Sequence, residues 1–227
     1  MGPQHELGWG MSNWLRRLAP LTGVVFLVLF VIGYIQLNDG TPSTDASGAK
    51  VISYYNAHNQ GGIGFTLMLS MVFGLFFFGI LRSYLRRAPR AEWLSAVALS
   101  GAVVFTIGIA VDAGTAYALS DVPTHLSSGA AQALNVLSSD LSMWFYPAGL
   151  CVFMLALGLA FLRSGLFPRW LGWVTAVIGV AAVLGPLIEP AFYLTGVWIL
   201  VVSVWLFQRS AAVALTDGTS LSGTSPA

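Results

Sequence analysis

The sequence predicts an all-α membrane protein, a helical bundle that crosses the bilayer six times. Three observations support this prediction. Of 227 residues, 56% are hydrophobic and only 8% are charged, whereas about 25% are charged in a typical soluble domain. Six long apolar stretches alternate with polar loops. All nine arginines fall on one side of a six-span arrangement, and the single lysine, Lys50, falls on the other.

Each apolar stretch approaches the length that a membrane helix needs, because a helix rises about 1.5 Å per residue and the hydrocarbon core is ~30 Å thick. The predicted spans are Leu18–Leu37, Gly61–Leu81, Trp93–Leu119, Leu141–Leu162, Trp170–Ile188 and Ala191–Phe207. We interpret the first span as a retained helix, because it exceeds the apolar core of a signal peptide and no A-x-A-like cleavage site follows it.

The polar parts of the chain complete the predicted organisation. Residues 1–13 form a cytoplasmic lead, residues 14–209 form the membrane domain, and the Ser/Thr/Gly/Ala-rich residues 210–227 form a disordered tail. Each of the long loops, 38–60 and 120–140, is predicted to carry a short helix on the membrane surface. Pro147 is expected to kink the fourth span.

The arginines predict the orientation. Basic residues gather in cytoplasmic loops, so both termini are expected in the cytoplasm and both long loops outside, in the plasma membrane. A five- or seven-span arrangement would scatter the arginines over both sides. The net charge of +1 gives no reason to expect nucleic acid as a partner. The expected partners are the lipid bilayer and, as a homo- or hetero-oligomer, other membrane proteins.

Short matches indicate an internal repeat. Ser47–Ala49 recurs as Ser128–Ala130 at an offset of 81 residues. Trp93-Leu94 recurs as Trp170-Leu171, and each pair is followed after the same distance by an acid, Asp112 or Glu189. We interpret the six spans as three helical hairpins related by a parallel repeat, with an axis along the membrane normal.

The repeat predicts a polar site near the outer surface. Acids within spans usually face a bundle interior or a cavity, and 19 residues from Trp93 to Asp112 cover most of the bilayer. The candidate ligand or proton-site residues are Asp112, Glu189, Asp140, His58 and His125. Of these, His58, His125 and Asp112 are the candidate ligands of a divalent metal.

Structural explanations apply to the same residues. Asp112 is equally explained as a hydrogen-bond partner of a neighbouring helix, and Glu189, flanked by prolines, as a solvated corner residue. The two histidines lack the spacing of known zinc motifs. No serine lies in a G-x-S-x-G turn, so hydrolase chemistry is poorly supported by the sequence.

Several of these segments carry a resemblance to a family. The segments are Thr44–Ala49, Tyr54–His58, Leu81-Arg82 and Pro168–Trp173. Over residues 14–208 the chain resembles bacterial, largely actinobacterial, six-span membrane proteins grouped as a domain of unknown function. The resemblance implies a helical bundle in the plasma membrane and carries no activity or catalytic residue with it.

Three functions fit the pattern. The first is a binding or accessory subunit of the cell envelope with an outward-facing polar pocket. The second is an intramembrane enzyme that uses a metal to hydrolyse or transfer part of a lipid-like substrate. The third is a proton-coupled transporter of small molecules that uses Asp112. No motif identifies the catalytic residues that the intramembrane enzyme would need.

Overall fold

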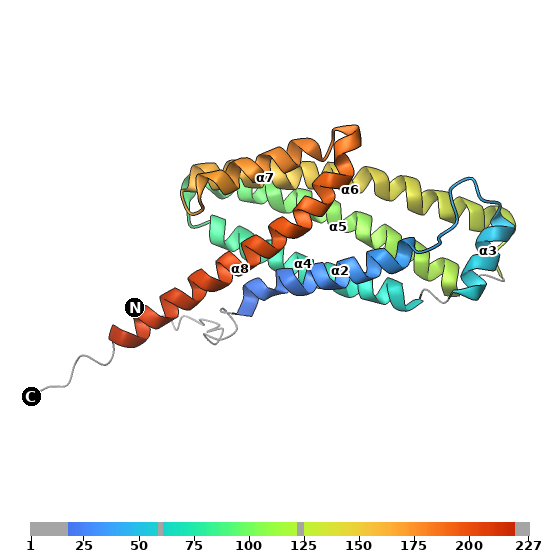
Figure 1. The fold of residues 1–227 in the computed structure, drawn as a ribbon, viewed down its shortest axis with the longest axis horizontal. Coiled ribbons are helices and arrows are strands. Elements are labelled where there is room, and N and C mark those ends of the chain that lie inside the picture. The colour runs from blue at the N-terminus through green and yellow to red at the C-terminus, as the bar shows by residue number, and fades with distance from the viewer. Residues whose placement is uncertain (1–17, 59–60, 122–124, 221–227) are drawn as a thin grey trace, which may run out of the picture.

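The computed structural model describes residues 18–58, 61–121 and 125–220, and it is all-α over these ranges (Figure 1). The N-terminal lead, the Trp14-Leu15 pair, Arg16 and Arg17 lie outside the described residues. The main helices are α2 (Thr22–Asn38), α3 (Gly48–Ala57), α4 (Gly61–Leu85), α5 (Glu92–Asp121), α6 (Ser128–Ser164), α7 (Arg169–Ala181) and α8 (Ile188–Ser220). Short 3-10 turns, η1 (Ala19–Leu21), η2 (Pro89–Ala91) and η3 (Gly185–Leu187), precede α2, α5 and α8.

Five helical segments among the described residues are long and apolar enough to cross a membrane. They are Ala19–Asn38, Gly61–Leu85, Pro89–Asp121, Ser128–Ser164 and Gly185–Arg209. The predicted fifth span, Trp170–Ile188, differs, because α7 ends after 13 residues at Ala181. Gly185 then takes a positive φ of 31° and Pro186 has no N–H to donate, so the helix cannot continue through this stretch.

The predicted fourth span begins too late. The sequence suggests a separate surface helix before Leu141, but α6 is one continuous helix of 37 residues. The Ser127 side chain caps its first turn by accepting a hydrogen bond from the backbone N–H of Ala130. Pro147 lies inside α6 without ending it. In the first half of the chain the corresponding helix is interrupted, since α3 ends at Ala57 and α4 begins at Gly61.

The predicted short helix of the first loop is confirmed as α3. It lies across the end of the bundle where α6 begins (Figure 1). Val51 and Tyr55 of α3 pack with Leu119 of α5 and Ala131 of α6 in a small apolar cluster. The Tyr54 hydroxyl donates a hydrogen bond to the Asp39 carbonyl. We call this end of the bundle the α3 end.

The opposite end carries the arginines. The seven described arginines lie at the α4–α5 and α6–α7 connections and near the middle of α8: Arg82, Arg86, Arg87, Arg90, Arg163, Arg169 and Arg209. Arg209 joins these elements, because it stacks on Trp205 and donates hydrogen bonds to the Tyr84 hydroxyl and the Leu166 carbonyl. Lys50 lies in α3, at the other end. We call the end that carries the arginines the arginine end.

Glycines set the closest helix contacts. A methyl group on Gly149 of α6 would overlap the backbone nitrogen of Phe105 in α5, and Gly101 of α5 lies equally close to Phe153 of α6. On α2, a methyl group on Gly23 would overlap the Ser203 side chain of α8. Small residues therefore let these backbones approach each other, as is usual in membrane helices.

α8 crosses the bundle obliquely (Figure 1). It approaches α2 most tightly at Gly23 and Ser203, and it is tied to α7 by a hydrogen bond from the Trp198 indole nitrogen to the Thr175 hydroxyl. The helix continues to Ser220, ten residues beyond Ser210, where the sequence predicts disorder. The Ala-Ala-Val-Ala-Leu run after Ser210 consists mostly of good helix formers, which accounts for the difference.

The contact between α5 and α6 gives a first prediction. Gly149→Ala should lower the free energy of unfolding by about 1–3 kcal/mol, the usual cost of overpacking, because the new methyl meets backbone that cannot rotate away. Thermal unfolding of the detergent-purified protein measures the change. Gly79→Ala is the matched control, since open space surrounds Gly79 and the change should be neutral or slightly stabilising. Equal stability of the two variants would contradict the close approach.

Candidate functional site

Asp112 is the best-defined polar group within the bundle. It lies in α5 and is only 6% exposed. The Tyr146 hydroxyl of α6 donates a hydrogen bond of 2.6 Å to one carboxyl oxygen, and the Ser138 hydroxyl lies 3.5 Å from the other. Thr115 continues the network by donating to Ser138 at 2.9 Å. Asp112 thus joins α5 to α6, which is the structural role that the sequence already suggested for it.

Glu189 and Asp112 both lie near the Tyr34 side chain. Glu189 is exposed in the first turn of α8, and both carboxylates are close enough to the Tyr34 hydroxyl to interact with it electrostatically. Tyr34 belongs to the last turn of α2, so three helices contribute to this group.

The other candidate residues do not join this group. His58 stacks on the Tyr54 ring with the centroids 4.4 Å apart and faces solvent at the end of α3. His125 precedes α6, Asp140 lies within it, and both side chains are exposed. Among the residues that the structure describes, no three His, Cys, Asp or Glu side chains lie close enough together to hold a metal ion. The proposed ligand set of His58, His125 and Asp112 therefore has no geometric support.

Tyr55 shows how firmly α3 is seated. Its side chain is only 5% exposed. Burial, with smaller contributions from Tyr54 and Asp112, raises the pKa of the Tyr55 phenol to about 12. A phenol that resists ionisation in this way stays neutral at physiological pH. Tyr55 is thus an apolar contact that seats α3 on the bundle.

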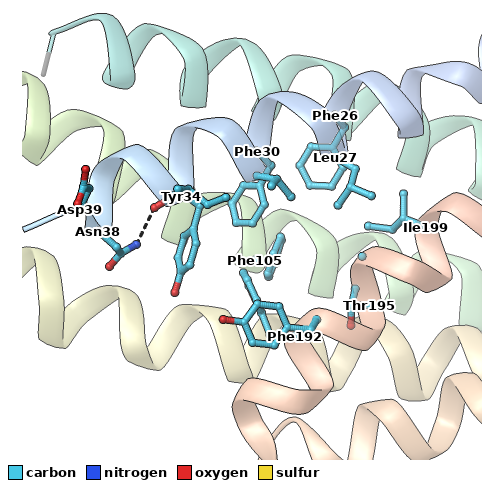
Figure 2. Close-up of a pocket in the computed structure, with 14 residues that line it drawn as sticks. Phe26, Leu27, Phe30, Tyr34, Asn38, Asp39, Phe105, Phe192, Thr195 and Ile199 are labelled. Carbon is cyan, nitrogen blue, oxygen red and sulfur yellow. Dashed lines mark hydrogen bonds between the residues drawn. The ribbon is translucent and has the colours of Figure 1, made fainter.

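A crevice between α2 and α8 is the main hollow beside this group (Figure 2). Its volume is about 600 Å³. The lining residues come from α2 and the loop after it, from α8, and from one position of α5: Phe26, Leu27, Phe30, Val31, Tyr34, Ile35, Asn38, Asp39, Phe105, Phe192, Tyr193, Thr195, Gly196 and Ile199. We call it the α2–α8 crevice. Its size is typical of ligand-binding sites.

Polarity changes along the crevice. Phe26, Leu27 and Ile199 line it nearer the arginine end, whereas Tyr34, Asn38 and Asp39 line it towards the α3 end. Figure 2 shows the Tyr34, Phe30, Phe105 and Phe192 side chains gathered between α2 and α8. Their rings contact one another, with Phe192 5.4 Å from Tyr34 and 5.6 Å from Phe30 between centroids. The crevice is thus apolar in depth and polar at one end.

A second hollow, of about 410 Å³, lies between α4 and α5. It is lined by small and apolar residues such as Gly64, Phe65, Met68 and Ala113. Tyr117 supplies the hydroxyl at its edge. Because this hollow lacks a polar end, it serves as a comparison for the α2–α8 crevice.

Most of the residues that line the crevice were not predicted from the sequence. From the sequence, Asn38, Asp39 and Tyr193 could join the candidate acids and histidines of the outer polar site, whereas nothing singled out Phe30 or Phe105. One signal was available, since Phe26, Phe30, Tyr34 and Asn38 recur every four residues and so share a helix face that becomes polar at its end. No comparable signal marks Phe105, whose position follows from how α5 packs.

The Tyr146–Asp112 hydrogen bond gives a second prediction. Tyr146→Phe removes the hydroxyl donor from a buried carboxyl and should lower the free energy of unfolding by about 1–3 kcal/mol. Thermal unfolding in detergent measures the change. Tyr117→Phe, which removes an exposed hydroxyl from α5, is the control and should be close to neutral. A Tyr146→Phe variant as stable as this control would show that the bond does not hold α5 to α6.

Comparison with known proteins places the chain in a family without assigning an activity. No curated protein and no solved structure matches it. A family model described as a domain of unknown function, DUF4386, matches residues 21–212, which include all the helices that form the bundle and the crevice. With most of its length matched, the chain belongs to the DUF4386 family.

Proposed function

We propose that this protein binds a lipid-like amphiphile in the α2–α8 crevice and acts as a binding or accessory subunit in the cell envelope. The observation behind the proposal is the gradient along the crevice, with apolar walls in depth and tyrosine, amide and carboxylate groups at the α3 end. An amphiphile has the same gradient. Its chain would lie between α2 and α8, and its headgroup would lie beside Tyr34 and Asn38.

The dimensions of the α2–α8 crevice suit one acyl chain. The lining of α2 extends from Phe26 to Asn38, which is roughly 18 Å at 1.5 Å per residue. That length is more than half of the ~30 Å hydrocarbon core of a bilayer. With its headgroup at the membrane interface, a chain that fills this crevice would therefore reach just past the bilayer midplane.

The crevice is open on the lipid side. Val31 and Ile35 of α2 and Tyr193 of α8 line it and are 43%, 63% and 67% exposed. In a bilayer these side chains face the acyl chains of the surrounding lipid. An amphiphile can enter sideways from the leaflet, whereas a water-soluble ligand would have to cross apolar surface to reach the same walls.

The charge distribution supports an orientation in the plasma membrane. Every described arginine lies at one end of the bundle. By the positive-inside rule this end faces the cytoplasm, so both termini are cytoplasmic and the polar end of the crevice faces outward. In this arrangement α7 and the turn after it together complete a sixth crossing, and the six crossings form the three hairpins of the proposed repeat.

Photolabelling tests the amphiphile site. The probe is a neutral glycosyl diacylglycerol with a diazirine in one acyl chain, in nanodiscs that contain the full chain. Peptides that cover Phe26–Ile35 and Phe192–Ile199 should be labelled. Val31→Trp, which fills the crevice, should lower this labelling roughly tenfold, corresponding to about 1.4 kcal/mol of lost contact.

Two internal controls accompany that experiment. Val28→Trp places the same side chain on α2 at a position that is 51% exposed and does not line the crevice, so labelling should persist. Labelling near Phe65 and Met68 in the α4–α5 hollow should not respond to either change. If Val31→Trp and Val28→Trp give the same pattern, the crevice is not the binding site.

Cysteine labelling tests the orientation. In a Cys151→Ala background, Ser43→Cys in the exposed loop before α3 should react with a membrane-impermeant maleimide on intact cells. Ser220→Cys at the end of α8 should react only after permeabilisation. Equal reaction of both positions on intact cells would contradict the proposed six crossings and the cytoplasmic termini.

A further inference from the structure

We propose that the α2–α8 crevice selects an amphiphile with a cationic headgroup, such as a quaternary or primary ammonium. This inference rests on the proposed amphiphile site and names the chemistry of its headgroup. Two features of the crevice lead to it, the aromatic rings of its walls and the sign of the charges around its polar end.

The crevice is lined by aromatic rings, of which Tyr34 and Phe192 are partly exposed and Phe30 and Phe105 are buried. The Phe30 and Tyr34 rings stack at 5.7 Å, and Phe192 lies within 6.3 Å of Phe30, Tyr34 and Phe105 between centroids. The negative face of such a ring attracts an ammonium group within about 6 Å, and sites for quaternary ammonium ligands are often built in this way.

The charges around the polar end are negative. Asp39 lines the crevice, and Asp112 and Glu189 both interact electrostatically with Tyr34 at its edge. None of the lining residues is basic. The ion pair found among the described residues joins Arg86 to Glu92 at the arginine end and does not involve Glu189. An anionic headgroup would meet repulsion here, and a cationic one would meet attraction.

Charge complementarity therefore separates three headgroups that could accompany the same chain. A phosphate-exposing anionic headgroup is disfavoured by the carboxylates. A neutral sugar headgroup can accept hydrogen bonds from the Tyr34 and Tyr193 hydroxyls, but it gains nothing from the charge of the carboxylates. An ammonium gains from both the carboxylates and the ring faces.

The experiment compares three photoprobes that share the same acyl chains and diazirine. Their headgroups are trimethylammonium, neutral glycosyl and anionic phosphoglycerol, and each is used at equal mole fraction in nanodiscs with the full chain. Labelling of Phe26–Ile35 and Phe192–Ile199 is normalised to labelling in the α4–α5 hollow. We expect the trimethylammonium probe to exceed the glycosyl probe by about two- to fivefold, as for one exposed cation–π contact, and the phosphoglycerol probe to be lowest.

Two variants locate the source of the preference. Asp39→Asn, which removes a carboxylate that lines the crevice, should reduce the ratio of trimethylammonium to phosphoglycerol labelling while neutral-probe labelling stays unchanged. Asp140→Asn removes an exposed carboxylate of α6 that does not line the crevice, so it should leave the ratio unchanged. Loss of the ratio in both variants would assign the preference to general surface charge and overturn this inference.

The outcomes distinguish this inference from the proposed function. If no probe labels the crevice, or if Val31→Trp leaves all labelling intact, the amphiphile site itself is rejected. If the crevice is labelled and blocked by Val31→Trp but the anionic probe labels as well as the cationic one, the amphiphile site stands and the headgroup selection is rejected.

Discussion

The close crossing of α2 and α8 is the contact on which the crevice depends. Gly23 admits the Ser203 side chain, so the two helices meet tightly towards the arginine end. Further along, Gly196 faces Leu27 and leaves space that a larger side chain would occupy. Because α8 runs obliquely, it cannot cover α2 along its whole length, and the uncovered part is the crevice (Figure 1).

Arg209 and the aromatic residues around it hold that crossing in place. The Arg209 guanidinium lies 4.0 Å from the centre of the Trp205 ring, and Trp205 stacks on Phe167 at 4.3 Å. The same guanidinium donates to groups on α4 and on the α6–α7 connection. This part of α8 is therefore anchored to two other parts of the bundle, α4 and the α6–α7 connection. Arg209 thus helps to fix the helix that forms one wall of the crevice.

At the other end, the rigid parts are α5, α6 and α3. Asp112 is buried and bonded to Tyr146, and Tyr146 in turn contacts Phe105 and Phe192 through its ring. A carboxyl in this position has a structural task, and it also lies close enough to Tyr34 of the crevice wall to interact with it electrostatically. The structural and functional explanations of Asp112 that the sequence left open are therefore compatible. Glu189, exposed and outside this network, is the freer of the two matched acids to meet a ligand.

The sequence by itself determined the all-α membrane class, the approximate limits of α2, α4 and α5, and the separation of arginines from Lys50, because apolar length and charge are local properties. Equal spacing from the Trp-Leu pairs does not give Asp112 and Glu189 equal depth, because α7 ends at Ala181, before the chain reaches Glu189. Tertiary structure decided that α6 is continuous, that α7 is short, and that His58, His125 and Asp140 stay apart. It alone revealed the crevice, because a phenylalanine that faces lipid and one that lines a hollow look the same in the sequence, and only the angle between α2 and α8 distinguishes them.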